Sequence, residues 1–314
     1  MAAPGVIRIG TRGSALALWQ ARHVAGLLTQ NTGIPCELVT IKTRGDKILD
    51  VALAKVGGKG LFVKEIEQAL IDGRVDVAVH PMKDMPGELM PGLAIGAVPP
   101  REDPSDVLVC REASGLADLP RGARVGTSSL RRKAQLLALR PDLCVEEIRG
   151  NVETRINKLS TENLDAVVLA AAGMRRMGLW DKATEVLDPE VMLPAAAQGA
   201  LAIEIRENDP DIASLVRTLE DPAARALVTA ERSFLLRMEG SCQIPVAAMA
   251  RRENGRLALT GMVADLSGEP LLKDSAAAPV DQALELGADL ADKLLARGGR
   301  EILDKILREA GEQG

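Results

Sequence analysis

Apolar positions in the first hundred residues alternate between the strand period and the helix period. Short apolar runs at 6–10 and 36–42 predict strands, and helical spacing between them predicts a helix ending near Gly33. Residues 61–73 then predict an amphipathic helix, and residues 75–80 predict a buried strand. Strands and helices that alternate in this way are typical of an α/β unit with parallel strands and crossover helices.

The same alternation recurs after a segment rich in proline and charge at 99–106. The predicted elements are a strand at 123–126, a helix at 130–142, a strand at 144–150, a helix at 151–160 and a buried strand at 165–173. Residues 193–199 then predict a return crossing into a strand at 200–206. Two crossings between two α/β units predict a hinged pair of domains.

From about residue 220 the pattern changes to a long helix, a hairpin turning at Asn254 and Gly255, and two closing helices. We therefore predict an α/β protein with two hinged α/β domains and a smaller C-terminal α+β domain. The predicted boundaries are 1–100 with 200–219 for the first domain, 101–199 for the second, and 220–314 for the third.

Composition narrows the class of protein. The hydrophobic share of 46% and the charged share of 26% are those of an ordinary globular chain. Two Phe, two Trp and no Tyr leave few side chains on which single-stranded nucleic acid could stack. No apolar run is long enough to span a membrane, and the first residues do not have the pattern of a secretion signal. These features predict a cytoplasmic location.

Charge is distributed unevenly along the chain, whose formal net charge is −5. Residues 121–182 contain 12 basic and 7 acidic side chains, whereas residues 183–314 contain 14 basic and 23 acidic ones. A basic middle section in an acidic protein favours a small anionic ligand over nucleic acid, which usually needs a broad basic face. An unevenly charged, solvated surface is the alternative.

Three predicted strand-to-helix turns combine small polar residues with arginine. They are Thr11 to Ser14 with Arg12, Thr127 to Ser129 followed by Arg131 and Arg132, and Arg149 to Asn151 followed by Arg155. Arg175 and Arg176 follow the last predicted strand of the second unit. Free N–H groups at helix starts and planar guanidinium groups both favour carboxylate or phosphate. Ordinary helix capping beside solvated arginines is the alternative.

Two further segments could carry chemistry. Residues 54–65 place Lys55 and Lys59 among glycines without matching a P-loop, which is consistent with a lid over a cleft or with a surface loop. Residues 80–86 place Lys83 and Asp84 at the end of a strand, where they could act in acid–base chemistry or form a structural ion pair. We interpret His80 as a hydrogen-bonded core histidine.

The four cysteines are far apart, and the chain has only two histidines, so neither a disulfide framework nor a zinc site is expected. Cys36, Cys110 and Cys144 lie in or beside apolar runs and are expected to be buried. Cys242 follows a predicted helix end, where a thiolate could serve as a nucleophile or as an attachment point.

Nine segments taken together resemble one family over essentially the whole chain. They are TRGSALALWQ (11–20), KTRGD (42–46), GGKGLFVKEIE (57–67), DVAVHPMKDMP (76–86), VGTSSLRRKAQL (125–136), IRGNVETRINKL (148–159), LAAAGMRRMG (169–178), LPAAAQGALAIE (193–204) and EGSCQIPVAA (239–248). Their order and separations resemble those of the porphobilinogen deaminases, also called hydroxymethylbilane synthases. Family members often have Ser in place of Pro81, which leaves the loop geometry before Lys83 open. They often have Gln in place of Gly13, from which little consequence is expected.

The resemblance implies a three-domain enzyme, with its first two domains similar to bilobal solute-binding proteins. It implies that four porphobilinogen molecules are condensed head to tail, with release of ammonia, on a dipyrromethane cofactor joined by a thioether to Cys242. Asp84 is the implied catalytic residue, and Lys55 and Lys59 are placed on the active-site loop. The implied cofactor- and substrate-binding residues are Arg12, Ser14, Lys83, Ser129, Arg131, Arg132, Arg149, Arg155, Arg176 and, more weakly, Gln198. It further implies a monomer without nucleic-acid or membrane partners.

Two other classes use similar features. A solute-binding module for dicarboxylates would use the same α/β pair and arginines, but it would need neither Cys242 nor a third domain. A nucleotide-dependent transferase should show a P-loop or a dinucleotide fingerprint, and the sequence contains neither.

Overall fold

The computed structural model describes residues 5–47, 63–238 and 244–312, and these residues form two compact units. The first unit contains residues 5–47, 63–102 and 199–225, and the second contains 103–198, 226–238 and 244–312. The chain therefore passes from the first unit to the second after Glu102 and returns after Gln198.

The first unit is built on one five-stranded mixed sheet in the order β2-β1-β3-β10-β4. Its strands are β1 (Ile7–Thr11), β2 (Cys36–Thr40), β3 (Val77–Pro81), β4 (Leu93–Ala97) and β10 (Leu201–Arg206). Strands β1, β2 and β3 are parallel as predicted, but β10 is antiparallel to both β3 and β4. The prediction of parallel strands is therefore confirmed for β1, β2 and β3, and the sequence did not predict how β10 pairs. The returning chain enters beside the carboxyl end of β3, with Leu201 opposite Pro81, and so must run back along it.

Helices cover both faces of this sheet. They are α1 (Ala15–Thr32), α2 (Arg44–Lys47), α3 (Lys64–Ile71) and α7 (Pro210–Val216). The side chains of α1 and α7 pack with alternate residues of β3 and β10 on one face, whereas α3 packs on the other face around Ala78. Helix α1 ends as predicted at Gly33, whose φ of 73° is left-handed and whose N–H bonds to Thr29.

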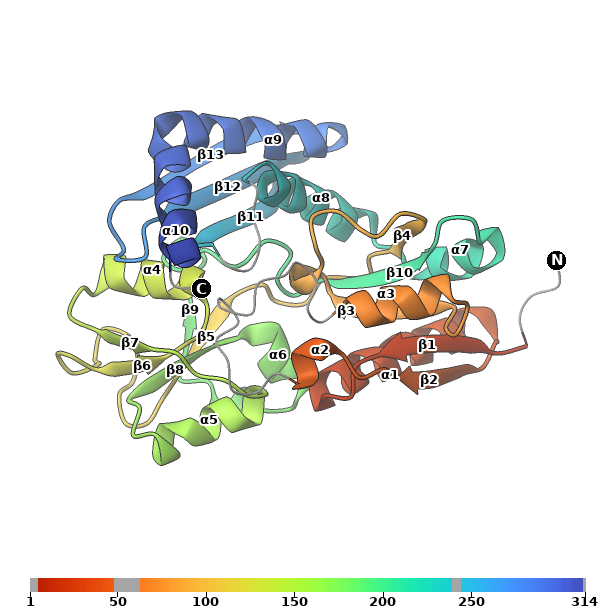
Figure 1. Ribbon diagram of the computed structural model, residues 1–314, viewed down its shortest axis with the longest axis horizontal. Helices are drawn as coiled ribbons and strands as arrows, with labels where there is room; N and C mark the ends of the chain where they lie inside the picture. Colours follow the sequence, from red (N-terminus) through yellow and green to blue (C-terminus); the bar gives the residue numbers. More distant parts are fainter. Residues whose placement is uncertain (1–4, 48–62, 239–243, 313–314) are drawn as a thin grey trace. The chain divides into compact units, whose positions relative to one another are not determined.

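The second unit contains a five-stranded sheet in the order β7-β6-β8-β5-β9. Its strands are β5 (Asp106–Cys110), β6 (Arg124–Gly126), β7 (Cys144–Glu146), β8 (Ala166–Ala170) and β9 (Glu185–Leu187), and its helices are α4 (Leu130–Leu139), α5 (Val152–Thr161) and α6 (Ala171–Arg176). Helix α4 lies on one face of this sheet and α5 on the other (Figure 1). The predicted strand at 165–173 is too long, because the chain turns into α6 at Ala171. Here β5 is antiparallel to β8 and β9.

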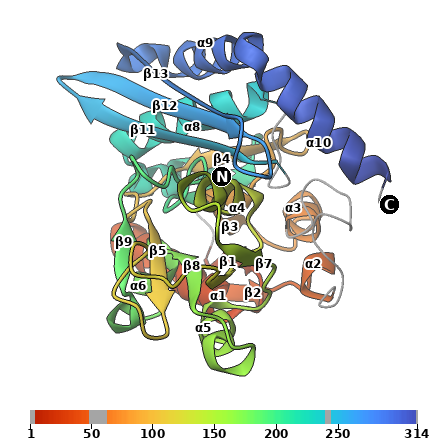
Figure 2. The same ribbon diagram turned by 90° about the vertical axis from the view of Figure 1, so that its left-hand side faces the viewer.

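The second unit also contains the antiparallel sheet β11-β12-β13. Its strands and helices are β11 (Val246–Glu253), β12 (Arg256–Ala264), β13 (Leu271–Pro279), α8 (Pro222–Arg237), α9 (Ala283–Leu294) and α10 (Arg300–Glu312). Helix α9 lies along this sheet in Figures 1 and 2. The predicted hairpin is confirmed, with Asn254 at φ 49° and Gly255 at φ 76° between paired Glu253 and Arg256. The two predicted closing helices are confirmed, whereas β13 was not predicted.

Five short helical turns complete the described structure: η1 (Met82–Asp84), η2 (Trp180–Lys182), η3 (Arg217–Leu219), η4 (Val280–Gln282) and the π-helical turn η5 (Leu295–Gly299). None of the described helices combines the length and the apolar character needed to cross a bilayer.

Candidate functional site

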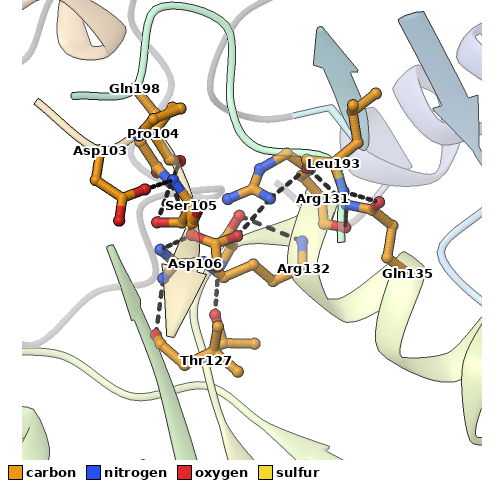
Figure 3. A network of polar contacts seen from close by, with 12 residues as sticks. Asp103, Pro104, Ser105, Asp106, Thr127, Arg131, Arg132, Gln135, Leu193 and Gln198 are labelled. Carbon is orange, nitrogen blue, oxygen red and sulfur yellow. Dashed lines mark hydrogen bonds and ion pairs between the residues drawn. The ribbon is translucent and has the colours of Figure 1, made fainter. Parts of the chain in front are cut away.

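A buried ion centre in the second unit joins two of the predicted arginines to one carboxylate (Figure 3). The Nη1 atom of Arg131 lies 2.7 Å from Oδ2 of Asp106, and Nη2 of Arg132 lies 2.7 Å from Oδ1. Arg131 also donates to the Leu193 carbonyl, and Arg132 donates to the Val168 carbonyl. The residues are 0 to 5% exposed, so two positive groups share one negative group out of contact with water.

The electrostatics of this centre leave an excess of positive charge. Burial alone would raise the pKa of Asp106, but the two arginines outweigh burial and hold that pKa far below its ordinary value. Arginine keeps its charge in proteins, so the three side chains together carry a net charge of +1. Within the part of the chain that the structure describes, both Nε atoms are buried without a hydrogen-bond partner. Such a centre suits a bound anion.

Gln198 connects this centre to both crossings of the chain. Its Nε2 atom lies 2.6 Å from the Pro104 carbonyl and 2.8 Å from Oδ1 of Asp106, and its side chain is buried (Figure 3). Residues 103–106 belong to the outgoing crossing, and Gln198 belongs to the return crossing. The amide therefore has a clear structural task in holding the two crossings together, besides any contact with a ligand.

The first predicted turn places Arg12 at the end of β1, where it pairs with Asp46 of α2. Its Nε atom lies 3.0 Å from Oδ1 of Asp46, and that carboxylate also accepts a hydrogen bond from the Thr43 hydroxyl at 2.8 Å. Burial alone would raise the pKa of Asp46, but these hydrogen bonds outweigh it and lower the pKa. The pair is about one quarter exposed, so the guanidinium group remains accessible to solvent.

Ser14 and Ser129 both serve as helix N-caps. The Ser14 hydroxyl accepts from the Ala17 N–H of α1, and the Ser129 hydroxyl accepts from the Arg132 N–H of α4, each at 3.4 Å. Both serines therefore cap their helices, but Arg131 and Arg132 beside Ser129 are buried and not solvated as the capping alternative expected. Capping is compatible with anion binding, because one hydroxyl satisfies only one of the free N–H groups at a helix start.

Of the remaining predicted arginines, Arg149 lies between β7 and α5, Arg155 lies in α5, and Arg176 lies in α6. The Nη2 atom of Arg149 lies 3.3 Å from Glu147, and Nε of Arg155 lies 2.8 Å from the Gly150 carbonyl. Arg176 ends α6 and is partly buried. Together with Ser129, Arg131, Arg132 and Gln198, these three arginines place seven of the predicted binding residues in the second unit.

Lys83 and Asp84 lie in η1, directly after β3 in the first unit, and both are partly buried. Pro81 fits this junction without loss. The Met82 N–H bonds to the Ala200 carbonyl at 3.0 Å, and because pairs in an antiparallel ladder alternate, Pro81 occupies a position without a ladder hydrogen bond to β10. Its φ of −64° is the value that proline prefers.

The prediction for His80 is confirmed. Its Nε2 atom lies 3.1 Å from Oε2 of Glu204 on β10, and the two side chains are 3% and 0% exposed. The prediction that the three cysteines are buried is wrong for Cys144, which is exposed, while Cys36 and Cys110 are partly buried. Cys144 is the first residue of the edge strand β7, so it has a paired strand on one side only.

Cys242, Lys55 and Lys59 lie outside the described residues. Among the residues that are described, no group of histidine, cysteine and carboxylate side chains could hold a metal ion.

Sequence reasoning missed Asp106 and Asp46, which pair with three of the predicted arginines. The segment ending at 106 was interpreted as a crossing, although Asp106 is followed at once by the apolar run Val107–Val109. An acidic residue at the start of a buried strand is a signal for a paired charge. Asp46 gave only a weak signal, because nothing in its spacing from Arg12 predicts contact.

Comparison with known proteins gives one consistent result. Residues 7–214 match the family model "Porphobilinogen deaminase, dipyromethane cofactor binding domain", and residues 226–296 match "Porphobilinogen deaminase, C-terminal domain". The chain is 51% identical to porphobilinogen deaminase of Maridesulfovibrio salexigens, covering 96% of this chain and 98% of the relative. It is 53% identical to that of Geobacter metallireducens, covering 97% and 96%.

Solved structures with lower similarity include the methionine-binding protein MetQ, at a TM-score of 0.44 and 15% identity over 69% of this chain and 90% of that one. A putative methionine-binding lipoprotein of Bacillus subtilis gives a TM-score of 0.42 and 14% identity over 69% and 91%.

Proposed function

This chain belongs to the porphobilinogen deaminase family, and on that premise we propose how its own residues serve the reaction. It is an enzyme of tetrapyrrole biosynthesis that condenses four porphobilinogen molecules head to tail into hydroxymethylbilane and releases ammonia at each addition. Its cofactor is dipyrromethane. The roles assigned below to single residues are our proposals.

The buried centre at Asp106 supports a carboxylate-binding role for Arg131 and Arg132. Dipyrromethane is assembled from substrate units and therefore carries acetate and propionate groups. A centre with a net charge of +1 and unused guanidinium donors fits such groups, because a buried excess charge is stabilised by a counter-ion. This fit is the observation that carries the proposal. When bound, the cofactor supplies the primer to which the first porphobilinogen is joined.

Asp84 is proposed as the catalytic residue. The aminomethyl nitrogen of porphobilinogen leaves as ammonia once it is protonated, and positive charge remains on the pyrrole of the substrate. A carboxylate at the end of β3 can hold a proton for the leaving nitrogen and then stabilise that charge. Lys83, the adjacent residue in η1, is proposed to attract carboxylates of the cofactor.

The other arginines are proposed to bind the carboxylates that accumulate as the chain of pyrroles lengthens. Each added ring brings an acetate and a propionate, so a single arginine pair would not suffice. Arg149, Arg155 and Arg176 follow strands of the second unit, and Arg12 with Ser14 follows β1 in the first. Lys55 and Lys59 are proposed to belong to a loop that excludes water from the site. Gln198 is proposed to contact the substrate or to influence the hinge formed by the two crossings of the chain.

Cys242 is proposed as the attachment point of the cofactor through a thioether. An intact mass spectrum of the protein, purified under denaturing conditions, tests this directly. We expect the native chain to exceed its sequence mass by two linked pyrrole units and Cys242→Ser to match its sequence mass. Cys144→Ser is the matched control, because Cys144 is an exposed thiol elsewhere in the chain and should leave the added mass unchanged.

An unmodified native chain, or a Cys242→Ser variant that keeps the added mass, would overturn the attachment. The first result would also favour the binding-protein alternative, since a module that only binds dicarboxylates has no need of a covalent primer.

The remaining assignments concern the protein as a whole. We propose three domains with the boundaries predicted above, a cytoplasmic location, a monomer, and no nucleic-acid partner. The net charge of −5 and the scarcity of aromatic residues support the last of these. Light scattering on a sizing column measures the oligomeric state.

A further inference from the structure

Three ionisable side chains are buried together beneath α3 in the first unit. His80 of β3 and Glu204 of β10 lie on the same face of the sheet and are paired at 3.1 Å. Glu67 projects from α3 toward them and is 2% exposed. Burying carboxylates and histidines costs free energy unless they are paired or hydrogen-bonded, because each loses its contact with water. The catalytic roles proposed above use none of the three.

The same three side chains bracket the segment that carries Lys83 and Asp84. His80 lies two residues before η1, and its pairing with Glu204 fixes the end of β3 against β10. Glu67 accepts a hydrogen bond from the Met90 N–H at 3.4 Å, on the far side of the same segment. Between these points, the backbone bonds of Met82 to Ala200 and of Met85 to Met82 form the turn itself.

We propose that His80 and Glu204 are positioning residues, which hold the junction between β3 and η1 so that Asp84 is presented in its working geometry. This inference rests on the role proposed for Asp84. Reaction rates are sensitive to such placement, since a shift of about 1 Å in a reacting group can cost roughly 100-fold in rate.

The charges around the pair are consistent with this role. Burial is the main reason why the pKa of Glu67 is raised, and the negative charge of Glu204 adds to it. The hydrogen bond from the Met90 N–H and the positive groups of His80 and Lys64 act in the opposite direction and lower the pKa of Glu67. Within the described residues, Oε1 of Glu204 is buried without a hydrogen-bond partner.

The test compares holoenzyme variants at this pair with a variant at the opposite end of β3. Glu204→Leu removes the partner of His80 at similar size, and Glu204→Gln restores an acceptor without charge. Asp76→Asn is the matched control, because Asp76 forms an ion pair with Arg8 at 2.6 Å just before β3 begins, away from η1. We measure kcat, KM, Tm and hydrogen exchange of the amides of residues 82–85.

We expect Glu204→Leu to lower kcat at least ~10-fold with little change in KM, because the geometry of a reacting group is disturbed rather than substrate binding. Exchange at Met82 should accelerate, and Glu204→Gln should recover part of both losses. Asp76→Asn should lower Tm while leaving kcat and the exchange of 82–85 unchanged. If Glu204→Leu does not fold, Glu204→Gln decides, with a smaller loss of kcat and faster exchange at Met82 expected.

Wild-type kcat and exchange in the folded Glu204 variants would overturn the positioning role. So would an equal loss of kcat in Asp76→Asn, since the effect would then be one of general stability. Asp84→Asn separates this failure from failure of the proposed function. We expect it to turn over at least ~100-fold slower. Near-normal turnover of Asp84→Asn would show that Asp84 is not the catalytic residue. Hydrogen exchange in the Glu204 variants would still show whether the pair holds η1 in place.

Discussion

At the scale of single residues, this protein pairs opposite charges at positions that are buried away from water. Asp106 is the clearest case, because one fully buried carboxylate neutralises part of the charge on Arg131 and Arg132. The sequence placed both arginines at a predicted helix start but gave no reason to pair them with a residue more than twenty positions earlier. Only the neighbouring positions of β5 and α4 in the folded unit bring them together.

Replacing Asp106 by Asn tests this centre. We expect the free energy of unfolding to fall by about 3–5 kcal/mol, because two guanidinium groups would remain buried without a counter-charge. Asp142→Asn is the control in the same unit, since its pair with Arg140 is about one quarter exposed and should contribute at most about 1 kcal/mol. Urea unfolding followed by circular dichroism measures both changes.

The pH dependence gives a second measurement on the same variant. The pKa of Asp106 is lower in the folded chain, so its ionised form stabilises the fold above the ordinary carboxyl pKa of about 4. That contribution is lost as the pH falls from there toward the folded-state pKa. The stability difference between wild type and Asp106→Asn should therefore be full at neutral pH and shrink below about pH 4. A difference that grows on acidification would contradict the ion centre.

At the scale of secondary-structure elements, small residues decide how closely helices approach. Gly287 of α9 faces the backbone of α8, where an added Cβ would lie 2.3 Å from the Ala230 carbonyl oxygen and 2.7 Å from the Phe234 nitrogen. A Cβ added at Gly26 of α1, by contrast, would have no atom within 4 Å. Both glycines lie inside helices, so propensity alone would favour alanine at each.

We expect Gly287→Ala to destabilise the protein by about 1–3 kcal/mol, because α9 would have to move away from α8. Gly26→Ala should instead stabilise it by up to about 1 kcal/mol through helix propensity. Thermal unfolding of the two variants beside wild type measures the contrast. Equal shifts of Tm would show that close helix packing at Gly287 does not limit stability.

The elements themselves were largely predictable, and the errors have a common cause. Period and capping signals found α1, α4, α5, α8 and the β11–β12 hairpin, because these depend on residues close in sequence. The direction of β10 and the presence of β4, β5, β9 and β13 were not predicted. Which neighbour a strand pairs with is set by where the chain re-enters the sheet, and no local pattern records that.

At the scale of the whole molecule, basic side chains are concentrated in the section of the chain that contains most of the proposed binding residues. The basic section at 121–182 contains Ser129 and five of the arginines assigned to carboxylate binding, within a protein of net charge −5. Arg131 and Arg132 are buried, but Arg149, Arg155 and Arg176 are only partly so, which leaves them open to screening by salt.

We expect KM for porphobilinogen to rise several-fold between roughly 0.1 M and 1 M sodium chloride, because the screening length falls from about 10 Å to about 3 Å. The value of kcat should change much less, since the role proposed for Asp84 is exerted at close range. Steady-state kinetics across this range, repeated with sodium acetate, measures the effect. A KM that is independent of salt would argue against attraction of substrate carboxylates by the accessible arginines.

The sequence by itself determined the family, the alternation of strands and helices, and the residue types suited to an acid-bearing pyrrole. It could do so because motifs, caps and hydrophobic periods are properties of neighbouring residues. Only the tertiary structure decided that Arg131 and Arg132 share Asp106, that Gln198 joins the two crossings, and that Glu204 lies beside His80. These pairs are separated by 25 to 124 positions. Burial makes these pairings necessary, because a charged or polar group removed from water needs a partner. The folded chain supplies that partner from a residue distant in sequence.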